Sequence, residues 1–127
     1  IKKITADDIT KDLSETGKSI VYITFDTDKS SITSAGTELV IQIAEALKND
    51  PSLKIAIEGH TDNTGDATHN KKLSTERAQA VMAALVAQKI DKVRLSAKGY
   101  GAERPLVAND SEDNKAKNRR VELVKMK

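Results

Sequence analysis

The chain has no cysteine, no tryptophan and very few aromatic residues: one phenylalanine and two tyrosines among its 127 residues. The absence of cysteine excludes disulfides, thiolate metal sites and a cysteine nucleophile. Aromatic side chains supply the stacking surfaces of many sugar sites and single-stranded nucleic-acid sites. With so few of them, the chain must hold a ligand mostly by charge and hydrogen bonds.

The sequence also lacks a long apolar run and a strong net charge. No segment is apolar for long enough to cross a bilayer, and no signal-peptide pattern is present. The formal net charge of +2 gives no indication of a nucleic-acid partner or an anionic membrane. Because the chain begins with Ile1 rather than methionine, we expect any targeting segment, membrane anchor or barrel to lie upstream.

Three helices are predicted from the spacing of apolar residues and from capping signals. The first spans 5–16, with Thr5 as its cap and Gly17 as its stop. The others span about 33–48 and 67–89. We expect 1–16 to be an N-terminal helical arm or linker, and 17–127 to be a single domain.

Four strands are predicted from runs rich in β-branched residues, at 19–25, 53–58, 93–97 and 119–124. Strands separated by helices pair in parallel, whereas the last strand follows a predicted loop at 99–114 and is expected to be antiparallel. The predicted fold class is therefore α/β (α+β). It is a two-layer sandwich in which helices pack on one face of a mixed four-stranded sheet.

An acid and a base stand at neighbouring ends of predicted elements. Asp62 follows an apolar strand, and Arg77 lies on the core-facing side of the next helix, between Leu73 and Val81 at four-residue steps. The two residues could form an ion pair that pins the helix to the strand, or Asp62 could simply cap a turn. Alternatively, both could bind a ligand that carries both charges itself.

A metal site is a further alternative. Glu58, His60 and Asp62 are spaced i, i+2, i+4, and His69 lies nearby, so oxygen and imidazole ligands could bind zinc or a harder cation. Gly59 and the following turn residues are expected to end the strand before Asp62, which disfavours the site. No glycine-flanked nucleophile is present.

Several motifs, in the same order and with the same gaps, resemble one known family. They are TFDTDKSSIT at 24–33, GHTDNTG at 59–65, Asn70, LSTERAQAV at 73–81, GYG at 99–101, Pro105 and NRRVEL at 118–123. Together they resemble the OmpA-like peptidoglycan-binding domain. The resemblance implies the OmpA-like fold and non-covalent binding of peptidoglycan through the diaminopimelate of the stem peptide. It also implies anchoring of an outer-membrane protein or lipoprotein to the cell wall, on the periplasmic side of the outer membrane of a Gram-negative bacterium.

The resemblance also implies a set of binding residues. Asp62 would accept from the ammonium group of diaminopimelate and Arg77 would grip its carboxylate, with Arg119 mainly structural and bracing the site. The remaining positions implied to contact the ligand are Thr61, Asn70, Leu73 and Ser74, together with Phe25, Asp26 and Asp28 of a loop whose backbone N–H groups could also donate.

We expect no catalysis, no cofactor, no metal and no nucleic-acid partner. The alternatives are a metal-dependent cell-wall hydrolase using Glu58, His60 and Asp62, or a protein-binding periplasmic scaffold.

Overall fold

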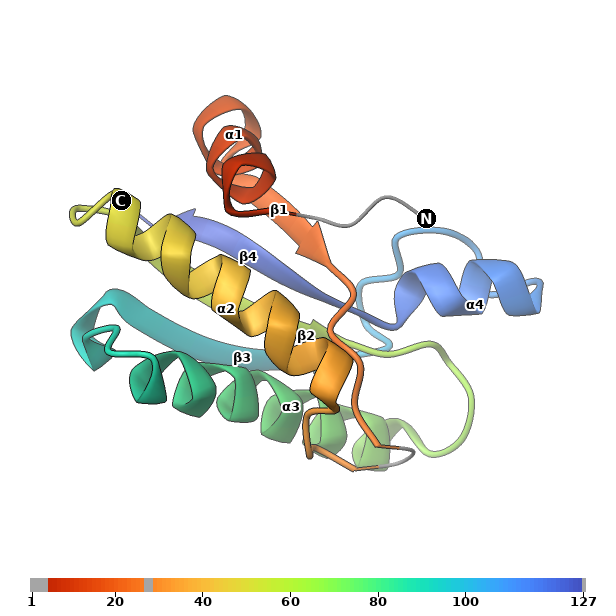
Figure 1. Ribbon diagram of the computed structural model, residues 1–127. Helices are drawn as coiled ribbons and strands as arrows, with labels where there is room; N and C mark the ends of the chain where they lie inside the picture. Colours follow the sequence, from red (N-terminus) through yellow and green to blue (C-terminus); the bar gives the residue numbers. More distant parts are fainter. Residues whose placement is uncertain (1–4, 27–28, 127) are drawn as a thin grey trace.

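The computed structural model describes residues 5–26 and 29–126, and these form four α-helices, one short 3₁₀ helix and four strands (Figure 1). In chain order the elements are α1 (Ala6–Thr16), β1 (Lys18–Val21), α2 (Ser34–Asn49), β2 (Lys54–His60), α3 (Ala67–Ala87), η1 (Lys92–Arg94), β3 (Leu95–Gly101), α4 (Glu112–Asn118) and β4 (Arg120–Met126).

Local capping fixes the ends of the first helix. The Thr5 hydroxyl accepts from the N–H of Asp8, and the Asp8 carboxylate accepts from the N–H of Thr5, so the two residues satisfy each other's exposed donors. Gly17 ends the helix in the left-handed conformation, with a φ of 77°. The helix predicted over 5–16 and both of its caps are confirmed.

The sheet is mixed, with the strand order β1-β4-β2-β3. β4 runs antiparallel to both β1 and β2, whereas β2 and β3 are parallel. The last strand of the chain is therefore inserted between the first two, antiparallel as predicted. This insertion places the start of β4 beside the end of β2.

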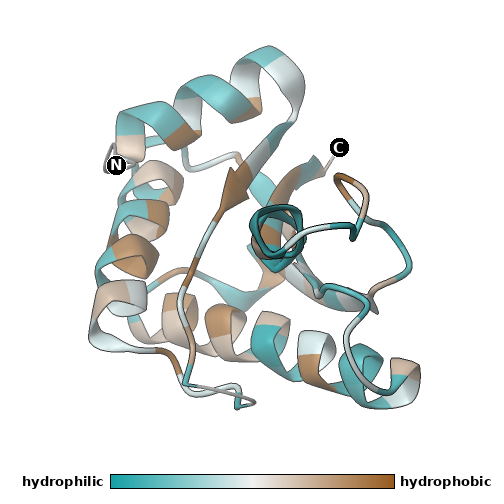
Figure 2. Cartoon of the chain, turned by 90° about the vertical axis from the view of Figure 1, so that its right-hand side faces the viewer, coloured by the Kyte–Doolittle hydropathy of each residue, from teal (hydrophilic) through white to brown (hydrophobic). Residues whose placement is uncertain are grey.

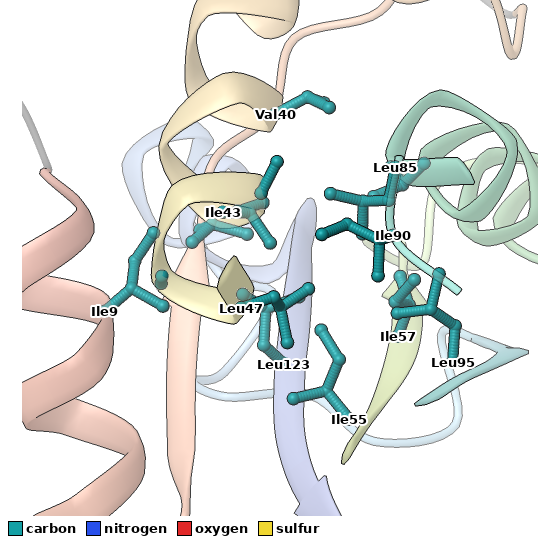
Figure 3. Packing of buried hydrophobic residues seen from close by; sticks show 14 of the residues in the cluster. Ile9, Val40, Ile43, Leu47, Ile55, Ile57, Leu85, Ile90, Leu95 and Leu123 are labelled. Atoms are coloured by element: carbon teal, nitrogen blue, oxygen red, sulfur yellow. The ribbon is translucent and has the colours of Figure 1, made fainter. Parts of the chain in front are cut away.

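The core lies between the sheet and two helices, α2 and α3, which cover one face of the sheet (Figure 1). This core includes Ile43 and Leu47 of α2, Ile57 of β2 and Leu123 of β4, and none of these four residues is more than 1% exposed (Figure 3). Ile9 of α1 is also fully buried beside α2, so α1 contributes to the same core. Within the described residues, no helix has the length and apolar character that crossing a membrane requires.

Three predicted segments differ from the structure. The strand predicted over 93–97 begins at Leu95, because Lys92–Arg94 form η1. The strand predicted over 19–25 ends at Val21, where its pairing with β4 ends opposite Val121, and the chain then turns away toward the end of the sheet. The loop predicted over 99–114 contains the last part of β3 and the start of α4. That helix is hydrophilic along its length (Figure 2), so apolar periodicity could not indicate it.

Candidate functional site

A cleft of about 410 Å³ opens at the end of the sheet where β2 ends and β4 begins. It is bounded by the 22–25 segment, by α3 and by α4. The lining residues are Tyr22, Ile23, Thr24, Phe25, Gly59, His60, Ser74, Arg77, Ala116, Arg119, Arg120 and Val121.

Two glycines let α3 lie directly on the strand ends beside the cleft. Gly59 and Gly99 face each other across β2 and β3. A Cβ atom at Gly59 would come within 2.3 Å of the carbonyl oxygen of Ser74, and one at Gly99 within 2.3 Å of the backbone nitrogen of Thr75. Only glycine permits so close an approach of backbone to backbone. The contact places Ser74 and Arg77 at the wall of the cleft.

Asp62 lies in the loop after β2, and hydrogen bonds occupy both of its carboxylate oxygens. The N–H of Thr64 donates to Oδ1 at 2.8 Å, and Nη1 of Arg119 donates to Oδ2 at 2.5 Å. Burial by itself would raise the pKa of Asp62, but the hydrogen bonds from Thr64 and Arg119 outweigh it and lower the pKa. Asp62 is therefore ionised at neutral pH.

Arg119 links three elements at the cleft. Its other terminal nitrogen, Nη2, donates to Glu112 of α4 at 3.0 Å, and its hydrogen bond to Asp62 is the main reason that its pKa is raised. The contact follows from strand register, because Arg120 pairs with His60 and so brings Arg119 to the loop after β2. The guanidinium braces Asp62, as expected, and it also lines the cleft. Its side chain is 40% exposed there.

Arg77 reaches the same cleft from α3. Its Nε donates to the carbonyl oxygen of Lys29 at 2.8 Å, and its guanidinium carbon lies 4.8 Å from the centre of the Phe25 ring. The predicted structural ion pair between Arg77 and Asp62 is wrong: in the described part of the chain, Asp62 pairs with Arg119 instead. The site therefore presents two guanidinium groups, of which the one from Arg119 is paired with a buried carboxylate.

Thr61, Asn70 and Leu73 do not line the cleft, and neither does Asp62, whose side chain is only 9% exposed. The N–H of Thr61 donates to Gly101 at 2.9 Å, and its hydroxyl donates to the carbonyl oxygen of Asp62 at 2.8 Å. The side-chain amide of Asn70 donates to the carbonyl oxygen of Thr64 at 2.9 Å. Leu73 is buried. In this structure Thr61 and Asn70 fix the loop that carries Asp62, while Ser74, Arg77, Arg119 and Phe25 line the cleft.

The structure describes the 25–28 loop only in part. The N–H of Asp26 donates to the carbonyl oxygen of Ser31 at 3.0 Å, and its carboxylate accepts from the Ser31 hydroxyl at 2.8 Å. The backbone N–H of Asp26 is therefore occupied within the loop in this structure, and donation from the loop to a ligand stays a prediction. Asp28 lies outside the described residues.

Several lining residues were not predicted from the sequence. Tyr22 and Thr24 line the cleft from the segment that continues beyond β1, and Ala116 lines it from α4. For Tyr22 and Thr24 a signal existed in the sequence, since they alternate with the apolar Ile23 and so point to the opposite face of an extended segment. For α4 the only local signals were the Ser111 cap and the acids at the start of the helix.

The predicted metal alternative of Glu58, His60 and Asp62 is wrong in its third member. Asp62 is held by Arg119, and the group that the structure brings together is Glu58, His60 and Glu122 of β4. His60 also stacks on Tyr100, with 5.4 Å between ring centres.

Comparisons with known proteins were consistent with each other. Residues 24–119 match the OmpA family. The peptidoglycan-binding protein ArfA of Mycobacterium tuberculosis is 37% identical over 102 residues, which cover 80% of this chain and 31% of that protein. The chain spans less than half the length of the first curated relatives that it matches.

Solved structures show the same fold. The peptidoglycan-associated lipoprotein from Burkholderia pseudomallei superposes with a TM-score of 0.73 at 34% identity, covering 82% of this chain and 88% of that one. The cell wall anchor of the T6SS from Pseudomonas aeruginosa superposes with a TM-score of 0.76 at 27% identity, covering 98% of both chains.

Proposed function

The chain belongs to the OmpA family, and on that premise we propose that it binds peptidoglycan non-covalently, through the diaminopimelate of the stem peptide. The proposed role is to anchor an outer-membrane protein or lipoprotein to the cell wall. The relatives support it through their names, which describe a peptidoglycan-binding protein, a peptidoglycan-associated lipoprotein and a cell wall anchor.

The observation that carries the proposal is the charge arrangement at the cleft. Two guanidinium groups, from Arg77 and Arg119, line it, and the ionised Asp62, whose side chain is 9% exposed, is paired with Arg119. The side-chain end of diaminopimelate carries one ammonium group and one carboxylate. Arg77 can grip the carboxylate through two parallel hydrogen bonds. Asp62 retains acceptor capacity on its two oxygens for the ammonium group, because a carboxylate offers about four acceptor positions.

The domain is a binding module and not an enzyme, as the family and its relatives indicate. The hydrolase hypothesis required Asp62 beside Glu58 and His60, which the structure does not provide. We place the domain at the periplasmic side of the outer membrane of a Gram-negative bacterium. Outer-membrane and lipoprotein names among the curated relatives support this location, although the mycobacterial relative shows that the family also occurs in mycobacteria.

Sedimentation with isolated wall sacculi tests the proposal. Purified protein is mixed with sacculi whose stem peptides contain diaminopimelate, and in parallel with sacculi that contain lysine. Wild type should sediment with the first and much less with the second. Arg77→Ala should reduce the bound fraction, with a dissociation constant raised roughly 10- to 100-fold, because one or two charge-assisted hydrogen bonds are lost.

A matched control is available on the same helix. Lys72 is exposed on α3 and does not line the cleft, so Lys72→Ala removes one positive charge without touching the site. It should sediment like wild type. An equal loss of binding in both variants would mean that the protein binds sacculi through general charge attraction. If folded wild-type protein sediments with neither kind of sacculi, the result would favour the protein-binding scaffold instead.

A further inference from the structure

A buried polar cluster lies on the sheet face that points away from α2 and α3. Glu58 and Glu122 face each other across β2 and β4, and His60 follows Glu58 by two residues, so the three side chains share a face. The alternate positions on the same strands, such as Ile57 and Leu123, face the helices. Two like charges directly opposite each other in a sheet are destabilising unless something neutralises them.

Within this cluster and the rest of the described chain, His60 lacks the hydrogen bonds that a buried histidine normally makes. Its side chain is only 2% exposed, and neither ring nitrogen has a hydrogen-bond partner in the described structure. A buried polar group without a partner is costly, and native structures rarely leave one. The Nε2 atom lies 3.9 Å from Oε1 of Glu58 and 3.8 Å from Oε2 of Glu122. The imidazole is therefore turned toward both carboxylates without bonding to either.

We propose that Glu58, His60 and Glu122 form a binding site for a divalent transition-metal cation of the zinc class. One imidazole and two carboxylates are a ligand set that zinc accepts, with a further position left for water. The three ligand atoms lie within 4.8 Å of one another. Zinc at its usual bond lengths needs neighbouring ligands about 3.3 Å apart, so small side-chain rotations must close the remaining gap.

Positively charged side chains next to the cluster already bind the Glu122 carboxylate. Lys18 Nζ lies 3.0 Å from Oε1 of Glu122, and Arg120 holds the other oxygen of the same carboxylate. Arg104, whose carbonyl oxygen accepts from Arg120 and whose guanidinium covers Tyr100, adds a further positive charge. The Lys18 side chain is 51% exposed, so it can turn into solvent and release Oε1. Because Oε2, the oxygen that faces His60, is held by Arg120, a bound cation takes Oε1 in place of Lys18.

The protein offers a matched pair of histidines for the test, since it has only two. His60 is buried in the cluster, whereas His69 is exposed on α3. Metal-free, untagged protein is titrated with zinc chloride by calorimetry, with magnesium chloride as the comparison. We expect one zinc ion per chain and no binding of magnesium at the same concentrations. His60→Gln should weaken zinc binding at least tenfold, and His69→Gln should leave it unchanged.

Two further measurements keep the test decisive if His60→Gln does not fold. Lys18→Gln removes the competing ammonium group at an exposed position and should tighten zinc binding by roughly tenfold, which an adventitious surface site would not show. In the wild type, added zinc should shift the imidazole NMR signals of His60 and not those of His69. The absence of stoichiometric zinc binding, or zinc signals confined to His69, would overturn the proposal.

Discussion

Replacing Gly59 by alanine should loosen the contact that places α3 at the cleft. The added Cβ would lie 2.3 Å from the carbonyl oxygen of Ser74 and 3.0 Å from its carbonyl carbon. Ordinary contact begins at about 3.4 Å, so the helix must move away from β2 by about 1 Å. Both partners are backbone, and no side-chain rotation can relieve the clash.

The substitution is expected to lower both the stability of the protein and its affinity for the ligand. Overpacking of this kind destabilises by about 1–3 kcal/mol, which urea denaturation measures as a lower midpoint at an unchanged slope. Ligand binding should weaken further than stability alone explains, because a shift of α3 carries Arg77 away from the ligand while Asp62 stays with β2. Titration of the folded variant with a diaminopimelate-containing stem peptide measures this loss of affinity.

Gly65→Ala is the matched control in the same region. Gly65 has a φ of 85°, and among the described residues no atom beyond its own two chain neighbours lies within 4 Å of the position that an added methyl group would take, so alanine there costs only backbone strain of about 1 kcal/mol. It should leave α3 in place and binding nearly unchanged. If Gly59→Ala matches wild type in both stability and affinity, the close approach does not position α3 and the reasoning is refuted.

Three further predictions concern stability, each measured by urea unfolding. Asn118→Ala should cost roughly 2–4 kcal/mol, because the buried Asn118 amide accepts from two backbone N–H groups and donates to two oxygens; a loss below about 0.5 kcal/mol would contradict this role. Ile9→Ala should cost about 2–5 kcal/mol, since Ile9 is fully buried, and an unchanged midpoint would mean that α1 is only an arm. The pKa of Asp62 is lowered from its ordinary value of 3.8, so the unfolded chain binds this proton more tightly than the folded protein. The stabilisation is therefore complete well above pH 3.8 and is lost as the pH falls below it; Asp62→Asn should flatten that part of the pH dependence, and an unaltered curve would refute the assignment.

The sequence predicted the elements whose ends carry local signals. Thr5 and Gly17 bound α1 because a capping box and a left-handed glycine act within a few residues. The same holds for Thr33, whose hydroxyl accepts from Gly36 at the start of α2. The antiparallel last strand followed from the absence of a predicted helix before it, although α4 does precede it. With seven residues, that helix is too short to carry the chain back to the opposite end of the sheet, which a parallel connection requires.

The site was predicted less completely, because its contacts depend on strand register. Nothing local in the sequence shows that Arg120 pairs with His60, and this pairing is what brings Arg119 to Asp62. The helical spacing of Arg77 predicted only that it lies on the core-facing side of α3, and its contacts with Phe25 and Lys29 depend on how a distant loop folds back. The assignment of residues 1–16 and 17–127 as separate units stays a prediction, which the Ile9 variant tests in part.

The most direct test of the central claim is calorimetric titration of the wild-type protein with three stem peptides that differ at one residue. That residue is free diaminopimelate, diaminopimelate with an amidated side-chain carboxyl group, or lysine. The account predicts binding to the first and weaker binding to the other two, because each lacks the carboxylate that Arg77 grips. Equal affinity for all three peptides would contradict the account.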